Sequence, residues 1–213
     1  MNETEFIKAN TRLLPVPLVP EVRLHLAEES LAIWRQTEEE LGRMNVPPPW
    51  WAFAWAGGQA LARYVLDNPA LAAGRSVLDL GAGSGLAGIA AARAGAVRVL
   101  AADTDAFAVA AVGLNAAANA VVLDATGDDL LAAEPPGCDL VLVGDLFYER
   151  PLAERVLAFL EAARSQGAAV VVGDPRRSYF PRERFSRVAE YAVPVTRDLE
   201  DMEIQRTGVW RLV

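Results

Sequence analysis

The chain has 213 residues and a formal net charge of -8, with 20 Lys and Arg against 28 Asp and Glu. This length favours a single α/β domain with an N-terminal extension, and the acidic balance argues against a protein that tracks the DNA or RNA backbone. The single cysteine, Cys138, and the single histidine, His25, exclude an internal disulfide and provide no Cys/His metal set, so no metal is expected.

The first ten residues are polar and include Glu3, Glu5 and Lys8. They lack the basic start and the apolar run of a secretory signal. No uninterrupted apolar stretch of the chain reaches the length needed to span a membrane. We therefore expect a soluble protein that makes no membrane contact, and a cytoplasmic one if the cell is bacterial.

Closely spaced prolines exclude a helix between residues 13 and 20, because each proline removes a backbone donor and favours extended neighbours. This segment is predicted to be an extended arm that lies along a surface. Residues 28–44 then show apolar side chains at near-helical spacing, and the three prolines at 47–49 end the predicted helix. Residues 57–67 form the next predicted helix.

From residue 75 onward, apolar runs alternate with Ala-rich helical patterns, which is typical of a parallel sheet covered on both faces. The strands are predicted near 76–80, 97–102, 120–123, 138–144 and 168–173, and the helices between them near 86–94, 106–118 and 151–165. A last helix is expected after residue 181, followed by a terminal antiparallel hairpin formed by 191–195 and 208–213. We expect residues 1–56 to be an arm and a helix packed on an α/β domain of residues 57–213, as one structural unit.

The first of these strands ends in a glycine-rich turn that opens a helix, as in sites that bind nucleotide cofactors. Gly83-x-Gly85-x-x-Gly88 matches the fingerprint of a dinucleotide site. Asp103 lies 20 residues beyond Gly83, where an acid that binds the ribose is expected. The glycine spacing alone therefore fits a nicotinamide cofactor.

A second interpretation starts earlier, as Asp79-x-Gly81-x-Gly83-x-Gly85, and gives the carboxylate at the strand end a role. A diphosphate gains nothing from an extra negative charge there. S-adenosylmethionine carries a cationic sulfonium and an ammonium group instead, so an acid beside the turn suits it. We therefore prefer S-adenosylmethionine as the cofactor, with S-adenosylhomocysteine as its product.

Further acidic residues follow the next strands. Asp103 ends the second strand and is placed to accept hydrogen bonds from the ribose hydroxyls; Asp105 is the better candidate for the N-cap of the following helix. Asp128 and Asp129 follow the third strand, where an acid or amide meets the adenine amino group in this fold. Which of the two aspartates does so stays open.

Asp145 directly follows the buried strand predicted at 138–144. Because ligands in open α/β sheets bind at the carboxyl ends of the strands, Asp145 is expected in the same crevice as Asp79. The site would then hold an acid that faces the reactive methyl group.

Three segments, together with the glycine turn, carry a resemblance to a known family. These are Asp145-x-x-Tyr148, the Trp-rich segment 50–59 and the turn 173–177. With them the chain resembles the seven-strand lysine methyltransferases of methyltransferase family 16, from about residue 6 to residue 210. The resemblance implies a Rossmann-like class I methyltransferase fold, with a mostly parallel seven-stranded sheet, helices on both faces and an N-terminal helical extension.

The resemblance also implies roles for the residues that match it. Asp145 is expected to hold the ε-amine of a substrate lysine, and Tyr148 to wall the lysine channel. Together with the glycine turn, these implications yield Trp55, Gln59, Asp79, Gly81, Ala82, Gly83, Gly85, Asp103, Thr104, Asp128, Asp129 and Gly144 as cofactor residues, and Trp51 and Phe147 as channel residues.

Within that family the chain is most similar to members that methylate the electron transfer flavoprotein β subunit, so the resemblance implies this protein as substrate. A methyltransferase that acts on a ribosomal protein or a small amine stays open, because the glycine core is shared. A nicotinamide-dependent oxidoreductase leaves Asp79 without a role. The intact set of Asp79, Gly81, Gly83, Asp103 and Asp145 argues against a cofactor-binding scaffold without activity. We expect a monomer that binds no nucleic acid.

Overall fold

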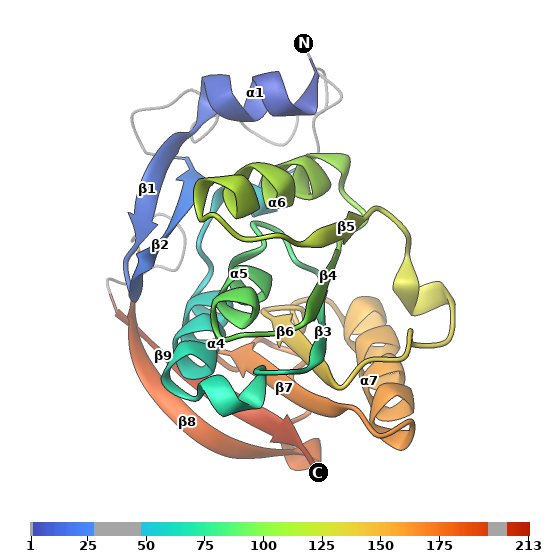
Figure 1. Ribbon diagram of the computed structural model, residues 1–213. Helices are drawn as coiled ribbons and strands as arrows, with labels where there is room; N and C mark the ends of the chain where they lie inside the picture. The colour runs from blue at the N-terminus through green and yellow to red at the C-terminus, as the bar shows by residue number, and fades with distance from the viewer. Residues whose placement is uncertain (1, 28–47, 196–203) are drawn as a thin grey trace.

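The structure, a computed structural model, describes residues 2–27, 48–195 and 204–213. Its centre is a seven-stranded sheet in the order β5-β4-β3-β6-β7-β9-β8 (Figure 1). The first five strands in this order are parallel, and β9 runs antiparallel to both of its neighbours. The strands are β3 (Ser76–Leu80), β4 (Arg98–Ala102), β5 (Asp124–Thr126), β6 (Leu140–Gly144), β7 (Ala169–Asp174), β8 (Phe185–Pro194) and β9 (Ile204–Leu212).

The central strands are apolar on both faces because helices cover both sides of the sheet. Val77 of β3 packs with α4 (Ala56–Asp67) and α5 (Leu86–Arg93), whereas its neighbour Leu78 packs on the opposite side with α7 (Arg150–Ser165). The strands predicted at 76–80, 97–102, 138–144 and 168–173 are confirmed, as are the helices between them and the terminal antiparallel hairpin. The predicted α/β fold is therefore correct.

Two predicted elements, the strand at 120–123 and the helix after residue 181, are wrong. Residues 120–123 are not a strand, because Ala120 takes a positive φ of 54° at the end of α6 (Ala106–Ala118) and Val122 is exposed. The third parallel strand is instead β5. Among the described residues after 181 there is no α-helix; a 3₁₀ turn, η4 (Arg182–Arg184), leads directly into the long strand β8.

The N-terminal segment begins with α1 (Glu3–Asn10), whose N-cap Asn2 and Glu5 form a reciprocal capping box. The predicted arm is extended, as expected, but it is an antiparallel hairpin of β1 (Arg12–Val16) and β2 (Val19–Leu26). Its apolar side chains are buried against α4 and α5 in the same core as the sheet. The helix predicted at 28–44 lies outside the described residues.

Two asparagines near the end of α6 fix the hairpin to the domain. Asn119 accepts a hydrogen bond from the Arg23 N–H (3.0 Å) and donates to the Arg23 carbonyl (2.6 Å). Asn115 accepts from the His25 N–H (2.7 Å) and donates to the carbonyl of Ser84 in the glycine turn (2.8 Å). The hairpin is thereby tied to the turn that follows β3.

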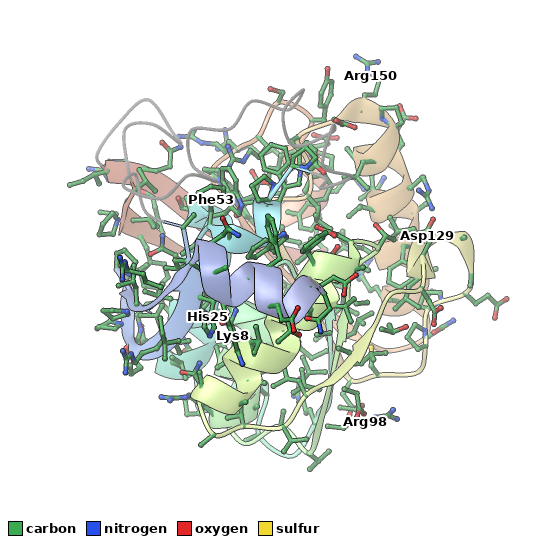
Figure 2. The ribbon with its side chains drawn as sticks, turned by 90° about the horizontal axis from the view of Figure 1, so that it is seen from above. Lys8, His25, Phe53, Arg98, Asp129 and Arg150 are labelled. Carbon is green, nitrogen blue, oxygen red and sulfur yellow. The ribbon has the colours of Figure 1, made fainter. Side chains whose placement is uncertain are left out.

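Lys8 of α1 and His25 of β2 lie near each other (Figure 2). Burial and the charge of Lys8 lower the pKa of His25 below its usual value. In the part of the chain that the structure describes, no helix is both long and apolar enough to cross a membrane.

The order of the strands reverses at β3, because β4 and β5 lie on one side of it and β6 and β7 on the other. Loops that follow β3 and β6 therefore diverge to opposite faces of the sheet. Such a switch point opens a crevice at the carboxyl ends of the strands, where ligands bind in α/β sheets.

Candidate functional site

A cavity of about 600 Å³ lies at this switch point. Its walls come from the residues that follow β3, β4, β5 and β6, from the Trp-rich segment and from the loop after β7. The predicted site residues that line it are Trp51, Trp55, Gly81, Gly83, Asp103, Thr104, Asp128, Asp129, Gly144, Asp145 and Tyr148. Those that lie outside the lining are Gln59, Asp79, Ala82, Gly85 and Phe147.

The glycine turn after β3 forms the floor of the cavity. Gly81 and Gly83 both have positive φ values, 65° and 51°, which strain any side chain. A Cβ on Gly83 would approach nothing closer than 4.0 Å within the protein, so its backbone faces open space in the cavity. Gly85 instead begins α5 as its N-cap, with φ of 77°. It shapes the turn rather than the cavity wall.

Asp103 at the end of β4 has a fixed carboxylate. Its Oδ2 accepts the Gly83 N–H at 2.8 Å, and its Oδ1 accepts the Asp105 N–H at 3.0 Å. Each carboxylate oxygen has a further acceptor position, and the side chain lines the cavity. Asp105 is the N-cap of α6, as predicted, and accepts the Phe107 N–H.

The position of Asp79 differs from the prediction. Its carboxylate is buried beneath the glycine turn, where it accepts the N–H of Gly88 at 2.8 Å, and it does not line the cavity. Burial, reinforced by the nearby Asp103, raises the pKa of Asp79 to about 7. Asp79 therefore holds the turn against the start of α5 and does not face a ligand.

The raised pKa of Asp79 predicts a pH-dependent stability. Because the folded-state pKa of about 7 lies above the unfolded value near 3.8, the folded state binds more protons, and this group lowers stability as pH rises from about 4 to 7. Asp79→Asn keeps an acceptor for Gly88 and removes the charge. The free energy of unfolding of the variant minus that of the wild type is expected to be about 2 kcal/mol more positive at pH 8 than at pH 5, because only the wild type carries the buried charge at pH 8.

Denaturant unfolding at the two pH values measures this difference. Asp124→Asn, at an exposed aspartate paired with Arg98, is the matched control and should show little change between the two pH values. If Asp79→Asn changes the free energy of unfolding equally at pH 5 and pH 8, the pKa of Asp79 is not raised in the folded protein.

The two aspartates after β5 have different partners. Asp129 accepts the Leu131 N–H and forms an ion pair with Arg155 of α7 at 2.6 Å; Figure 2 shows Asp129 beside that helix. Asp128 uses Oδ2 to accept a hydrogen bond from the Thr126 hydroxyl at 2.7 Å. Because the charge of Asp129 is already paired with Arg155, Asp128 is the better acceptor for a ligand.

Asp145 occupies the opposite wall, directly after β6. It is buried, its Oδ2 accepts the Gly58 N–H at 2.9 Å, and its φ of 59° lies in the left-handed region. This turn directs Leu146 and Tyr148 to the cavity and Phe147 to the core, where Phe147 packs edge-on against Phe180. Phe147, predicted to wall the channel, is thus buried and lies outside the cavity lining.

Tyr148 is 44% exposed at the rim of the cavity. Burial of the rest of its ring raises the pKa of the phenol above its usual value, so the hydroxyl keeps its proton at neutral pH. Trp50 lies beside it, with ring centroids 6.4 Å apart, and is 50% exposed. Trp51, predicted at the channel mouth, lies in the cavity wall, where it is fully buried and stacks on Phe107. Trp50 takes the rim position.

Gln59, predicted as a cofactor neighbour, makes its hydrogen bonds inside the protein. Its buried amide accepts the Leu18 N–H and donates to the Ala54 carbonyl. These bonds hold the hairpin to the start of α4, and Gln59 does not reach the cavity. Trp55 does line the cavity, and its indole N–H donates to the carbonyl of Trp50.

The loop after β7 adds a residue that the sequence did not assign to the cavity. Arg177 donates from Nε and Nη2 to Oδ1 of Asp145, at 3.1 and 2.8 Å, and its guanidinium lies 5.7 Å from the ring centre of Trp55. Asp174 is fully buried and accepts the Arg177 N–H at 2.7 Å. Burial, with a contribution from Asp145, raises the pKa of Asp174 to about 7.

Gly57 brings the N-terminus of α4 against the sheet beside Asp145. A methyl group on Gly57 would collide with the carbonyl oxygen of Gly173 and lie 2.5 Å from Oδ2 of Asp145. A methyl group on the next residue, Gly58, meets nothing within 4 Å. The close approach at Gly57 positions the helix N-terminus whose Gly58 N–H holds Asp145.

This asymmetry predicts opposite outcomes for neighbouring substitutions. Gly57→Ala is expected to lower the free energy of unfolding by about 3 kcal/mol, because backbone must move to make room. Gly58→Ala should be neutral or should stabilise the helix by up to about 1 kcal/mol. Thermal unfolding of the two variants makes the comparison, and equal melting temperatures would rule out the collision.

The cavity lining fits S-adenosylmethionine. The volume of about 600 Å³ lies within the range of small-molecule pockets. The fixed Asp103 carboxylate offers acceptors to a ribose, and the open backbone at Gly83 permits close approach. Aromatic and acidic side chains, Trp55 and Asp145, stand at the other end, where they suit cationic groups.

Comparison with known proteins places these features in context. A family model for ribosomal protein L11 methyltransferase (PrmA) matches residues 59–139. The electron transfer flavoprotein β subunit lysine methyltransferase of Danio rerio is 37% identical, over 97% of this chain and 81% of its own length. The Xenopus laevis protein of the same name is also 37% identical, over 96% and 85%.

Among solved structures, the magnesium protoporphyrin IX methyltransferase from Synechocystis with bound SAM superposes with a TM-score of 0.53. It is 20% identical and covers 73% of this chain and 78% of that chain. At this identity the similarity supports the fold alone. The architecture is that of the class I methyltransferases.

Proposed function

Because the chain belongs to the electron transfer flavoprotein β subunit lysine methyltransferases, we propose that it methylates lysines of an electron transfer flavoprotein β subunit. The observation that carries the proposal is the 37% identity with a protein of that name over 97% of the chain. The chain is a methyltransferase that depends on S-adenosylmethionine. Its own lysine substrate is the proposed part.

The match to the ribosomal protein L11 methyltransferase model does not favour a ribosomal substrate. It ends at residue 139, just before β6, and so omits Asp145 and Tyr148. The matched region contains the glycine turn and Asp103, which belong to the cofactor side of the cavity. This match supports the cofactor and leaves the acceptor to the residues after β6.

On the cofactor side, we assign the ribose to Asp103 and the adenine amino group to Asp128. Asp103 is held by two backbone donors with acceptor positions left over, and Asp128 is less engaged than Asp129. Gly81, Gly83, Thr104 and Gly144 contribute to the walls around them. Bound there, S-adenosylmethionine supplies an electrophilic methyl group on a sulfonium.

On the acceptor side, we assign the substrate ε-amine to Asp145. A free lysine has a pKa of about 10.4, so its ammonium must lose a proton before the nitrogen can attack the methyl carbon. The Asp145 carboxylate orients the amine and stabilises the positive charge that develops on it. Tyr148 and Trp50 flank the approach at the rim.

The charge of the chain is consistent with a lysine-bearing partner. Its net charge is -8, and the lining of the cavity includes Asp103, Asp105, Asp128 and Asp129. Opposite charges on the two proteins accelerate their encounter and favour the correct orientation.

Two further statements belong to this proposal. One is the division into an arm of residues 1–56 and a domain of residues 57–213, and the other is a monomeric state.

Incubation of the protein with radiolabelled S-adenosylmethionine tests the substrate. Equal amounts of the electron transfer flavoprotein and of ribosomal protein L11 from the same organism are supplied in separate reactions. We expect label in the flavoprotein β subunit, on lysines identified by peptide mass spectrometry. Label in L11 and none in the flavoprotein would overturn the assignment.

A further inference from the structure

The carboxylate assigned to the substrate amine already holds a cation from the protein itself. Arg177 donates to Oδ1 of Asp145 from two nitrogens, at 3.1 Å from Nε and 2.8 Å from Nη2. The other oxygen of Asp145 accepts the Gly58 N–H. A carboxylate oxygen has two lone pairs, so Arg177 uses the acceptor capacity of Oδ1.

The surroundings of this guanidinium are those that a substrate ammonium needs. It has a carboxylate on one side and the face of Trp55 on the other, 5.7 Å from the ring centre, and all three side chains line the cavity. Carboxylates and the faces of aromatic rings, the indole above all, bind alkylammonium ions in proteins.

We infer that Arg177 is an internal occupant of the acceptor subsite, and that the substrate lysine displaces it from Oδ1 of Asp145 before methyl transfer. The inference rests on the proposed function for the identity of the substrate, and on the geometry at Asp145 for the occupant. Arg177 is thus a specificity-determining residue. It makes the subsite selective for lysines whose surrounding protein surface contributes enough binding to expel the guanidinium.

The local structure lets the side chain leave while the loop stays in place. The Arg177 backbone N–H is held by the buried Asp174, and the Tyr179 N–H donates to the Phe147 carbonyl at 3.1 Å. The Arg177 side chain itself is 22% exposed. These bonds hold the loop backbone without the guanidinium, so a change of the Arg177 side-chain rotamer moves the guanidinium away from Oδ1 while the loop backbone stays in place.

Calorimetric titration of the S-adenosylhomocysteine-loaded protein with n-butylammonium chloride measures the subsite directly. Arg177→Met keeps the length and the apolar stem and removes the charge. We expect it to bind butylammonium at least about tenfold more tightly than the wild type, a difference of about 1.4 kcal/mol. Arg177→Lys, which keeps a cation, should stay close to the wild type.

The matched control is Arg176→Met, which alters the neighbouring arginine that is exposed and does not line the cavity. It should leave butylammonium affinity unchanged. Equal or weaker binding by Arg177→Met than by the wild type would overturn the inference. A gain of the same size in Arg176→Met would overturn it as well, because the effect would then come from net charge.

Steady-state kinetics with the flavoprotein substrate provide a second measurement. If Arg177 is an occupant, Arg177→Met lowers KM about tenfold with kcat within about twofold of the wild type. A fall in kcat at unchanged KM contradicts the inference and makes Arg177 a residue that positions Asp145 for transfer. Failure of the proposed function is distinguishable, because the wild type then methylates no flavoprotein while the butylammonium titration still reports on Arg177.

Discussion

Replacing Asp145 by asparagine is expected to lower kcat for protein methylation by roughly 10²- to 10³-fold, with S-adenosylhomocysteine affinity within about threefold of the wild type. Asp145 follows β6 and Asp103 follows β4, and β3 lies between these two strands, so the substitution leaves the carboxylate assigned to the ribose unchanged. Without the negative charge, the positive charge that develops on the attacking nitrogen has no carboxylate to stabilise it.

Asparagine is the informative replacement because Asp145 has a φ of 59°. Asparagine tolerates the left-handed region at least as well as aspartate, whereas most other side chains are strained there. The amide oxygen also keeps an acceptor for the Gly58 N–H. A loss of turnover in this variant is thus assigned to the charge and not to a rearranged backbone.

Single-turnover methylation and calorimetry with S-adenosylhomocysteine measure the two quantities separately. Glu149→Gln is the control, since it removes an exposed carboxylate from the same loop without touching the cavity. Near-normal turnover in Asp145→Asn would remove Asp145 from the acceptor site. Loss of cofactor affinity together with turnover would place it on the cofactor side instead.

The central sheet was predictable from the sequence because its strands are apolar on both faces. Val77 and Leu78 face opposite helical layers, and such runs between Ala-rich helices are typical of a parallel sheet. The edges were less predictable. β8 is an edge strand with many exposed side chains, so its pattern resembles that of a surface helix. The short β5 pairs with β4 alone.

The acids that follow the strands were predictable as a group because every parallel strand ends at the same edge of the sheet. Their individual orientations were not. Asp79 was the reason for preferring S-adenosylmethionine, yet its carboxylate is turned beneath the glycine turn to Gly88. The cofactor was correct and this part of its rationale was wrong. The Asp103 carboxylate, fixed by two backbone donors, and the Asp145 carboxylate after β6 support the same cofactor better than Asp79 does.

Conformation at single residues accounts for the remaining errors in the site. The positive φ of Asp145 determines that Leu146 faces the cavity and Phe147 the core, and no pattern in the sequence reports that angle. Arg177 follows Arg176, which has a φ of 71°. Its contact with Asp145 joins loops 32 residues apart in the chain, so spacing within either segment does not reveal it.

Replacing Asp103 by alanine is expected to weaken S-adenosylhomocysteine binding by roughly 100-fold or more. Each hydrogen bond from a ribose hydroxyl to the carboxylate contributes about 1.5–3 kcal/mol, and two hydroxyls are available. The same change releases the Gly83 and Asp105 N–H groups that the carboxylate fixes. The cofactor thus loses its direct contacts and the ordered turn beneath it.

Asp103→Asn separates these two contributions, because an asparagine keeps one acceptor oxygen while its amide nitrogen cannot accept. Its affinity for S-adenosylhomocysteine, measured by calorimetry, should fall between those of the alanine variant and the wild type. Asp124→Asn, on β5 and outside the cavity lining, controls for net charge and should bind normally. Thermal unfolding shows whether each variant is folded. Wild-type affinity in a folded Asp103→Ala protein would exclude the carboxylate from the ribose site, and the end of β4 would then have to meet the cofactor through Thr104 and backbone groups alone.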